Sequence, residues 1–194
     1  MDSPDRHSDE QLMRASQSGD LAARDELVDR FLPVIHRLCR FLLREPAAVD
    51  DAVQESFLRI FKYLERWDGR PPKPWMLTIA YNRCVTIRQN MGRHRAQTIL
   101  DEPIQAENQH ELLLEAELSQ GVNGALGTLR PQFRDVLVLH HVGGLAVEDV
   151  ARQMRIPVGT VKTWLSRGRQ ALWDQLKTAG HVEGEMPRRP REDR

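Results

Sequence analysis

The stretch VEDVARQMRIPVGTVKTWLSRGRQALWDQL, residues 147–176, decides how the C-terminal part of this chain folds. Its first turns place Val147, Val150 and Met154 on one side of a short helix. The letters RIP then interrupt the helical pattern, and a second, longer helical pattern follows. Ala151 supplies a small side chain where two crossing helices must approach closely. This spacing predicts a helix-turn-helix.

The second helix of this motif separates apolar side chains from basic and hydroxyl ones. Val161, Leu165 and Leu172 recur at helical spacing and are expected to hold the helix to its domain. The side chains left on its outward faces are Lys162, Thr163, Ser166, Arg167 and Arg169. Thr160 and the free amides of the helix start suit a phosphate, whereas Arg and Lys reach phosphates or guanine edges. The pattern favours a DNA-reading helix, and the alternative is a solvated amphipathic helix at the edge of a bundle.

The composition of the chain excludes several classes of protein. Its 194 residues carry 28 basic and 28 acidic side chains, so it is not a general polyanion binder. No run approaches the roughly 18 apolar residues of a membrane span, and the polar N-terminus lacks the apolar core of a signal peptide. Cys39 and Cys84 are far apart in the sequence, which favours reduced, buried thiols. We therefore expect a cytoplasmic protein with no membrane insertion.

The first helices of the chain are marked by their capping residues. Ser8 and Gln11 form a capping box before a first helix. Gly19 is expected to end that helix, and Asp20 is expected to cap the next one. The second helix is predicted over Leu21–Leu43, where apolar residues recur at spacings of three and four.

A third helix carries an apolar stripe, and a fourth follows a proline-rich loop. The stripe consists of Val49, Ala52, Val53, Phe57, Ile60, Phe61 and Leu64. The opposite side carries Asp50, Asp51, Gln54, Glu55, Arg59 and Lys62, which alone would indicate solvated surface. The fourth helix is predicted over Trp75–Asn90, and its outer faces are expected to present Tyr81, Asn82, Arg83, Thr86, Arg88 and Gln89. Aromatic and amide groups beside positive charge suit unstacked bases.

The charge pattern then changes, and this change indicates the domain organisation. Between Gln97 and Leu129 the chain has acidic residues but no Lys or Arg, which predicts an acidic linker. Helices are predicted over Glu111–Leu126 and Pro131–Val142, ahead of the helix-turn-helix. The expected fold class is all-α, with two small helical domains joined by a flexible acidic linker. The predicted bounds are 8–95 for the first domain, 96–118 for the linker, 119–177 for the second domain and 178–194 for a disordered tail.

No catalytic constellation is evident in the sequence. The seven histidines are scattered, and no H-E-x-x-H, C-x-x-C, G-x-S-x-G or phosphate-binding glycine loop occurs. Asp50 and Asp51 are neighbouring carboxylates, but such pairs on an exposed helix are far more often solvated than metal-bound. We therefore predict no catalytic residues, no metal and no cofactor.

Three segments, taken in order, resemble a known family. They are DDAVQESFLRIFKYLERW (residues 50–67), PWMLTIAYNRCVTIRQNMGR (residues 74–93) and the segment from ALGTL to RQAL (residues 125–172). Together they resemble region 2 and region 4 of group IV, or extracytoplasmic-function (ECF), sigma factors of bacterial RNA polymerase. The resemblance covers nearly the whole chain, and its order and separations make it more specific than the helix-turn-helix alone.

The resemblance implies a role for each surface. The third helix is expected to bind the polymerase core (β and β′ subunits) through Asp51, Gln54, Glu55 and Arg59. The loop Asp68–Pro74 and the fourth helix would open and read the promoter −10 element, with contacts from Tyr81, Asn82, Thr86 and Arg88. The recognition helix would read the −35 element through Thr160, Lys162, Thr163, Ser166, Arg167 and Arg169. The linker would thread through the polymerase, and an anti-sigma factor that clamps both domains is common in the family.

The sequence departs from the family pattern at three places. The −10 loop, GRPPKP, is about one residue shorter than usual and has Pro72 near the position of a typical Phe. Arg155 stands in the turn where Gly is common, so it is expected to adopt a left-handed conformation at a cost. Pro157 replaces a frequent Ser and suits a first helical residue. A different interpretation is a helix-turn-helix regulator that acts without replacing the polymerase sigma subunit.

Overall fold

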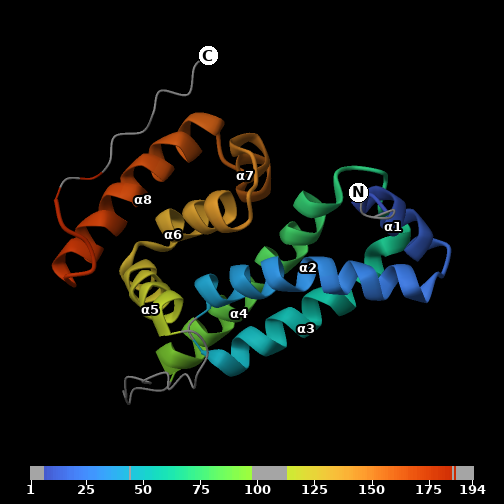
Figure 1. Ribbon diagram of the computed structural model, residues 1–194, viewed down its shortest axis with the longest axis horizontal. Coiled ribbons are helices and arrows are strands. Elements are labelled where there is room, and N and C mark those ends of the chain that lie inside the picture. Colours follow the sequence, from blue (N-terminus) through green and yellow to red (C-terminus); the bar gives the residue numbers. More distant parts are fainter. Residues whose placement is uncertain (1–6, 44, 98–112, 185, 187–194) are drawn as a thin grey trace.

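The computed structural model describes residues 7–43, 45–97, 113–184 and 186, and within them every regular element is a helix (Figure 1). The expected all-α fold class is therefore confirmed. The elements are α1 (Asp9–Gln17), α2 (Leu21–Leu42), α3 (Pro46–Tyr63), the 3-10 turn η1 (Leu64–Arg66), α4 (Pro72–Gln97), α5 (Leu113–Thr128), α6 (Pro131–Leu137), the π-helical turn η2 (Val138–Val142), α7 (Val147–Met154) and α8 (Val158–Thr178).

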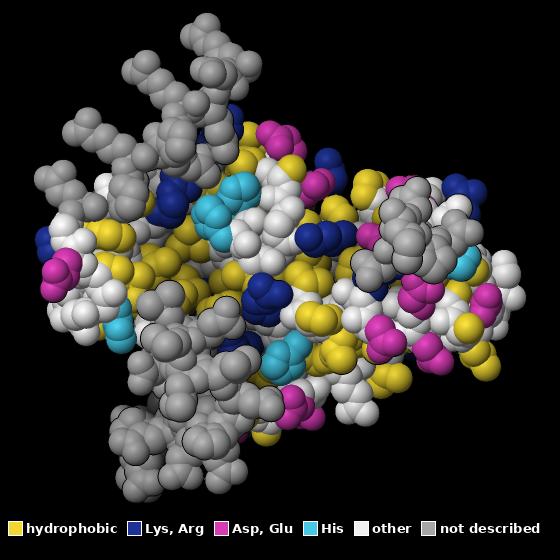
Figure 2. Space-filling model, in the orientation of Figure 1, with side chains coloured by type: hydrophobic (Ala, Val, Ile, Leu, Met, Phe, Trp, Pro, Cys, Tyr) yellow, Lys and Arg dark blue, Asp and Glu magenta, His cyan; other side chains and the backbone are white. Residues whose placement is uncertain are grey.

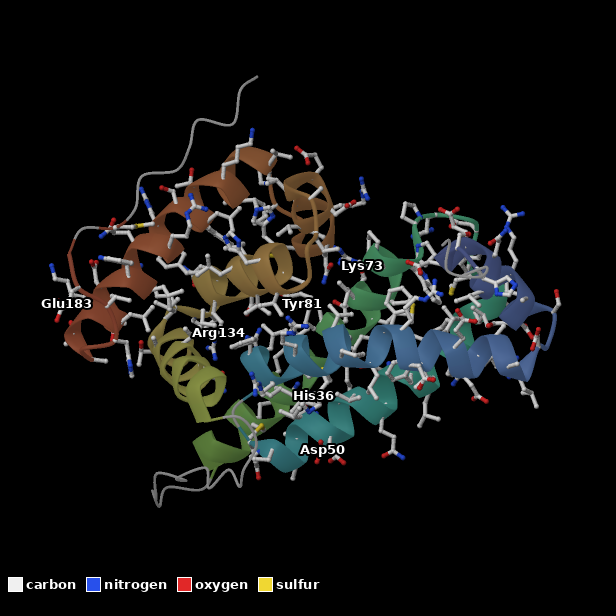
Figure 3. All side chains as sticks on the ribbon, viewed as in Figure 1. His36, Asp50, Lys73, Tyr81, Arg134 and Glu183 are labelled. Atoms are coloured by element: carbon white, nitrogen blue, oxygen red, sulfur yellow. The ribbon has the colours of Figure 1, made fainter. Side chains whose placement is uncertain are left out.

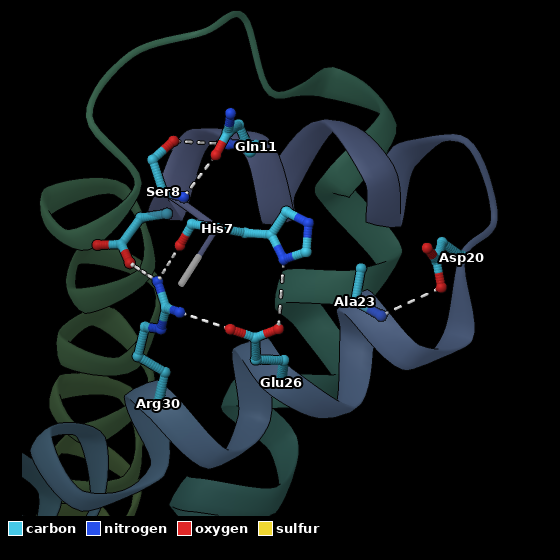
Figure 4. Close-up of polar contacts among 8 residues, drawn as sticks. His7, Ser8, Gln11, Asp20, Ala23, Glu26 and Arg30 are labelled. Carbon is cyan, nitrogen blue, oxygen red and sulfur yellow. Dashed lines mark hydrogen bonds and ion pairs between the residues drawn. The ribbon is translucent and has the colours of Figure 1, made fainter. Parts of the chain in front are cut away.

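The start of the fold is fixed by the predicted caps. The Ser8 hydroxyl accepts from the amide of Gln11, and the Gln11 side chain accepts from the amide of Ser8 (Figure 4). Asp20 caps α2 by accepting from the amide of Ala23 at 3.2 Å. Arg30 of α2 then donates to the backbone carbonyl of His7 and so ties the chain start to the second helix. The capping predictions for α1 and α2 are confirmed.

Helices α2, α3 and α4 form the N-terminal bundle around an apolar core. Leu27, Ile35, Leu38 and Ile60 are fully shielded from solvent there. The predicted stripe of α3 faces this core, with Phe61 at its edge. Helix α4 begins at Pro72 rather than Trp75, because a proline is well suited to a first helical turn. The expected loop over residues 68–74 is therefore shorter, and its last residues belong to α4.

The two cysteines meet in this core although they are distant in sequence. Cys39 of α2 and Cys84 of α4 are fully buried, with their Sγ atoms 3.5 Å apart. The contact with Cys84, and then burial, raise the pKa of Cys39. The thiols are free, as expected, and they act as small apolar groups that let α2 and α4 pack closely.

The C-terminal bundle is built around a close approach of α6 and α8. A Cβ added to Gly168 of α8 would lie 3.2 Å from Cδ1 of Leu137 and 3.3 Å from Cβ of Phe133. A larger residue at this position would require the side chains of Leu137 and Phe133 to shift. The predicted helix over residues 131–142 is continuous in direction but changes from α6 to the wider η2 after Leu137.

The two bundles pack directly against each other. In Figure 1, α6 lies beside α2 and α4 at the centre of the molecule, and contacts join α2 to η2 and to α5. The buried apolar residues of both bundles form one contiguous cluster. At the contact, a Cβ added to Gly143 would come within 3.2 Å of Leu77 Cδ1 on α4. The Leu77 side chain of α4 thus closely approaches the backbone of the C-terminal bundle at Gly143.

Most of the predicted linker and the end of the predicted tail lie outside the described residues. These are residues 98–112 of the linker and residues 185 and 187–194 of the tail. The predicted helix over residues 111–126 begins at Leu113 within the described part of the chain. None of the helices in the described part is long and apolar enough to cross a membrane.

The cap of α2 gives a test of this fold. Replacing Asp20 with Ala removes the acceptor for the amide of Ala23, so the free energy of unfolding should fall by about 1 kcal/mol. Asp29, which is exposed within the same helix, provides the control Asp29→Ala with little expected change. Denaturant unfolding of the full chain measures both, and equal losses would contradict the role of the cap.

Candidate polymerase and nucleic-acid interfaces

The helix-turn-helix is present as predicted. Val161 and Leu165 of α8 are buried at 0% and 3% exposure, so this face holds the helix to its bundle. Arg155 ends α7 with φ 57° and ψ 45°, which confirms the expected left-handed turn. Pro157 precedes α8 as its N-cap, and Val158 is the first helical residue. Pro157, which suits a first helical residue, therefore stands one position before the helix.

Helix α8 presents most of the predicted DNA-reading side chains to solvent. Lys162, Thr163, Ser166 and Arg167 are exposed, and Thr160 is partly exposed at the helix start. Arg169 differs, because its side chain is half-buried and its Nη1 atom is shielded from solvent. Arg169 therefore lies at the margin of the exposed face and not on it, which corrects the expectation of an outward position. The exposed set offers cationic and hydroxyl donors suited to bases and phosphates.

The predicted core-binding residues lie together on the outer face of α3. Asp51, Gln54 and Arg59 are exposed. Glu55 is partly buried because it accepts from Arg59 one turn later and forms an ion pair of 2.6 Å with Arg83 of α4. Glu55 therefore also fixes α3 against α4, whereas Asp51 and Gln54 remain available to a partner.

The predicted −10 residues on α4 are divided between two faces. Asn82 and Thr86 are exposed one turn apart, and the Thr86 hydroxyl donates to the carbonyl of Asn82. Tyr81 is only 7% exposed, and Arg88 is partly buried. The expectation that all four side chains face solvent is therefore wrong for Tyr81 and Arg88. Both face the C-terminal bundle, where Asp135 of α6 meets them.

Asp135 joins the two bundles through three charged or polar contacts. The Tyr81 hydroxyl donates to Asp135 Oδ2 at 2.9 Å, and the two terminal nitrogens of Arg88 donate to both carboxylate oxygens at 2.7 Å each. Asp135 is 4% exposed. In Figure 3, Tyr81 lies between the ribbons of α4 and α6. A planar guanidinium and a carboxylate match in this two-bond geometry, which is among the strongest pairings in proteins.

The protonation states at this contact follow from its burial and charge. Burial, and then the charge of Asp135 and its hydrogen bond, raise the pKa of Tyr81. Burial alone would lower the pKa of Arg88, but the hydrogen bonds and charge of Asp135 outweigh it and raise that pKa. Tyr81 therefore stays a neutral donor and Arg88 stays a cation throughout the physiological pH range.

The loop before α4 is held by its own side chains. Arg70 pairs with Asp68 through Nη2 and Oδ2 at 2.6 Å, and hydrogen bonds from Arg70 lower the pKa of Asp68. The buried Trp67 donates from its indole nitrogen to the carbonyl of Arg70. The buried Trp67 side chain thus covers the end of the core of the N-terminal bundle. The shortened loop leads directly into Pro72, the first residue of α4.

Charge is mixed on the molecular surface. On the face shown in Figure 2, Lys and Arg side chains are interspersed with acidic and apolar ones and form no continuous basic area. This agrees with equal numbers of basic and acidic residues in the chain. Among the described residues, no group of His, Cys, Asp or Glu side chains is arranged to hold a metal ion.

Comparison with known proteins identifies the family. Sigma-70 region 2 matches residues 27–93, and Sigma-70, region 4 matches residues 120–172. The chain belongs to the sigma-70 family. It is an ECF sigma factor, a non-enzymatic protein that directs promoter-specific transcription initiation. The N-terminal bundle contains region 2, with α3 and most of α4, and the C-terminal bundle contains region 4.

Curated relatives of this sigma factor are ECF sigma factors. SigE of Mycolicibacterium smegmatis is 28% identical over 166 residues, which cover 82% of this chain and 65% of SigE. SigW of Bacillus subtilis is 28% identical, with 83% of this chain and 92% of SigW covered. The sigma-E factor of Escherichia coli K12 is 29% identical, with 88% of this chain and 95% of the relative covered.

Solved structures share the fold. CnrH, solved in complex with the cytosolic domain of CnrY, superposes with a TM-score of 0.67 at 25% identity, covering 88% of this chain and 97% of CnrH. The sigma factor RpoE of Bartonella quintana, solved with the anti-sigma factor NepR, has a TM-score of 0.67 at 22% identity. The match covers 79% of this chain and 96% of RpoE, and it supports the fold alone.

The functional contact that sequence reasoning missed is Asp135. It follows Arg134 in a short helix ahead of the helix-turn-helix, and neither its residue type nor its spacing indicates that it meets α4. The apolar spacing of α6 would place Asp135 at the edge of the core. This spacing does not indicate which helix of the other bundle Asp135 contacts. Only the packing of the two regions brings Asp135 to Tyr81 and Arg88.

The turn of the helix-turn-helix provides a stability test. Replacing Arg155 with Gly should raise the free energy of unfolding by about 0.5–1 kcal/mol, because glycine adopts φ 57° without steric cost. The control is Arg152→Gly within α7, which should lower it by about 1 kcal/mol. Thermal or denaturant unfolding distinguishes the two, and a loss of stability in both variants would contradict the strain at Arg155.

Proposed function

We propose that this sigma factor performs its function through three separate surfaces, one for the polymerase core and two for the promoter. The observation that supports this division is the distribution of exposed side chains. An acidic and amide face lies on α3, a polar face lies on α4, and a cationic and hydroxyl face lies on α8. The two proposed promoter-reading faces, on α4 and α8, belong to different bundles, which suits recognition of two separate promoter elements.

The outer face of α3 is the proposed site for the polymerase core, its β and β′ subunits. Asp51 and Gln54 supply the exposed contacts, while Glu55 and Arg59 are joined by hydrogen bonds one turn apart. Leu58 lies on the same face and is 64% exposed, which provides an apolar centre among these polar groups. An exposed large apolar side chain ringed by polar ones is typical of a protein-binding surface.

Helix α4 is the proposed reader of the −10 element. Asn82 and Thr86 are ready to contact bases, and Tyr81 and Arg88 would join them once region 4 moves away. An aromatic ring stacks on an unstacked base, and an arginine neutralises phosphate. The shortened loop before Pro72 would give this protein its own preference within the element.

Helix α8 is the proposed reader of the −35 element in the major groove. The exposed side chains Lys162, Thr163, Ser166 and Arg167 would contact bases and phosphates. Thr160 and the amides at the helix start would bind a phosphate, and Arg169 would act at the edge of this face. A helix in the major groove can distinguish all four base pairs, so this surface suits duplex DNA.

We further propose a cytoplasmic location and an anti-sigma partner. CnrH and RpoE were solved with the proteins CnrY and NepR, and this chain shares their fold. Such a partner would cover parts of both regions.

The segment between α4 and α5 would thread through the polymerase, where its lack of basic residues limits binding to nucleic acid.

Reconstituted transcription tests the proposal. The purified chain is added to core RNA polymerase with a promoter selected from a random library, and initiated transcripts are counted. The proposal predicts transcripts from promoters with matched −35 and −10 elements, and none without the chain. Tight sequence-specific binding to DNA alone, with no transcripts, would instead favour a helix-turn-helix regulator.

The polymerase site predicts the effect of a charge reversal on α3. Asp51→Lys should weaken binding to the core polymerase about tenfold, because an exposed acidic contact becomes a repelling one. Asp51 is better suited to this test than Glu55, whose ion pair with Arg83 also holds α3 to α4. The control Asp29→Lys, on the exposed side of α2, should bind normally. Unchanged affinity of Asp51→Lys for the core polymerase would refute the outer face of α3 as the polymerase-binding site.

The DNA-reading face of α8 predicts a position-specific loss. Arg167→Ala should cost about 1–3 kcal/mol at one base pair of the −35 element if the guanidinium contacts a base edge. Arg152 of α7 is paired with Asp149, and Arg152→Ala should show no such positional pattern. Holoenzyme binding to a set of single-base promoter variants measures both. A uniform loss over all sequences would make Arg167 a phosphate contact.

A further inference from the structure

We propose that Asp135 is an internal latch that closes the free sigma factor by occupying DNA-reading groups of region 2. The carboxylate binds Tyr81 and Arg88, the two proposed −10 residues that are not exposed. This inference rests on the proposed function of α4. It adds that region 4 itself keeps that helix from DNA until the two bundles separate.

The geometry makes the two uses of these side chains mutually exclusive. Both terminal nitrogens of Arg88 donate to Asp135, so the edge of the guanidinium that would pair with a phosphate or a guanine is occupied. The carboxylate offers Arg88 the same two-oxygen pattern as a phosphate, and it carries negative charge that repels DNA. Tyr81 is 7% exposed and its ring is covered, so no base can stack on it in this arrangement.

Further contacts join the same face of α4 to the helix-turn-helix. The Thr78 hydroxyl lies 3.3 Å from Oε1 of Gln153, a residue of α7. Lys73 Nζ would lie 3.0 Å from a Cβ added to Gly144, so it closely approaches the turn before α7. The contact thus extends along α4 from its first turn to Arg88. Both promoter-reading regions are held in one arrangement, and their spacing is fixed by the latch.

The cost of breaking the latch explains why it holds the closed form. In the closed form Asp135 is 4% exposed, so a change that removes its charge leaves Arg88 partly buried without its partner. An unpaired, partly buried guanidinium strongly destabilises the closed form, whereas in the open form water solvates the guanidinium. The removal of one partner should therefore shift the closed-to-open equilibrium on the order of 100-fold toward the open form.

A distance measurement on the full chain tests the latch without polymerase or DNA. Spin labels are attached at Glu65→Cys, on η1, and Gln175→Cys, on α8, which are exposed positions in the two bundles. The native Cys39 and Cys84 are fully buried and do not react with the label. Pulsed electron paramagnetic resonance then gives the distribution of distances between the regions for the labelled chain and for its variants.

The variants are chosen so that the latch is broken from either side. Asp135→Asn and Arg88→Gln should each replace the single closed distance with longer, broader distances, and the double variant should open no further. Asp149→Asn removes a charge from an ion pair within region 4 and should keep the closed distance. Unchanged distances in both Asp135→Asn and Arg88→Gln would overturn the proposal. Equal opening by Asp149→Asn would overturn it too, since charge loss in general would then be the cause.

Binding to core polymerase separates this inference from the proposed function. Since the polymerase complex is expected to hold the two regions apart, Asp135→Asn should bind core polymerase several-fold more tightly than the parent chain, because a larger fraction is open. A parent chain that fails to bind core polymerase would refute the proposed function. The distance measurement contains no polymerase, so it would still decide whether Asp135 holds the regions together.

Discussion

A buried carboxylate must be paired, and this constraint governs how the two bundles of this protein meet. Asp135 lies on a short helix at the surface of the C-terminal bundle, and its carboxylate accepts hydrogen bonds from Tyr81 and Arg88 of the N-terminal bundle. Without them the carboxylate would lose hydration and gain nothing in return. This pairing fixes α6 to α4, beside the apolar contacts of α2 with η2 and α5 that also join region 4 to region 2.

The same constraint affects which surfaces of this chain, which has no net charge, can bind DNA. A neutral protein has weak general affinity for DNA, so its recognition depends on small groups of exposed side chains. Most of those on α8 and on the α3 face are exposed, while part of the α4 set is engaged within the molecule. Function therefore depends on which face of α4 is covered, and not only on which residues it carries.

Much of the fold was predictable because local rules determine it. The capping box at Ser8, the N-cap at Asp20 and the left-handed Arg155 all follow from residue types and spacing, and all are present. Helical periodicity, however, only separates an apolar face from a polar one. It cannot tell whether a polar face meets water or another domain, so Tyr81 and Arg88 were expected in solvent. The meeting of Cys39 and Cys84 likewise required tertiary packing.

The central claim is that one face of α4 serves Asp135 in the free protein and promoter DNA in the polymerase complex. A cryo-electron microscopy structure of the chain with core polymerase and an open promoter tests it most directly. The account predicts separated regions, with Asp135 far from Arg88 and with Tyr81 and Arg88 against the −10 strand. An intact contact between Asp135 and Arg88 in a transcribing complex would contradict it.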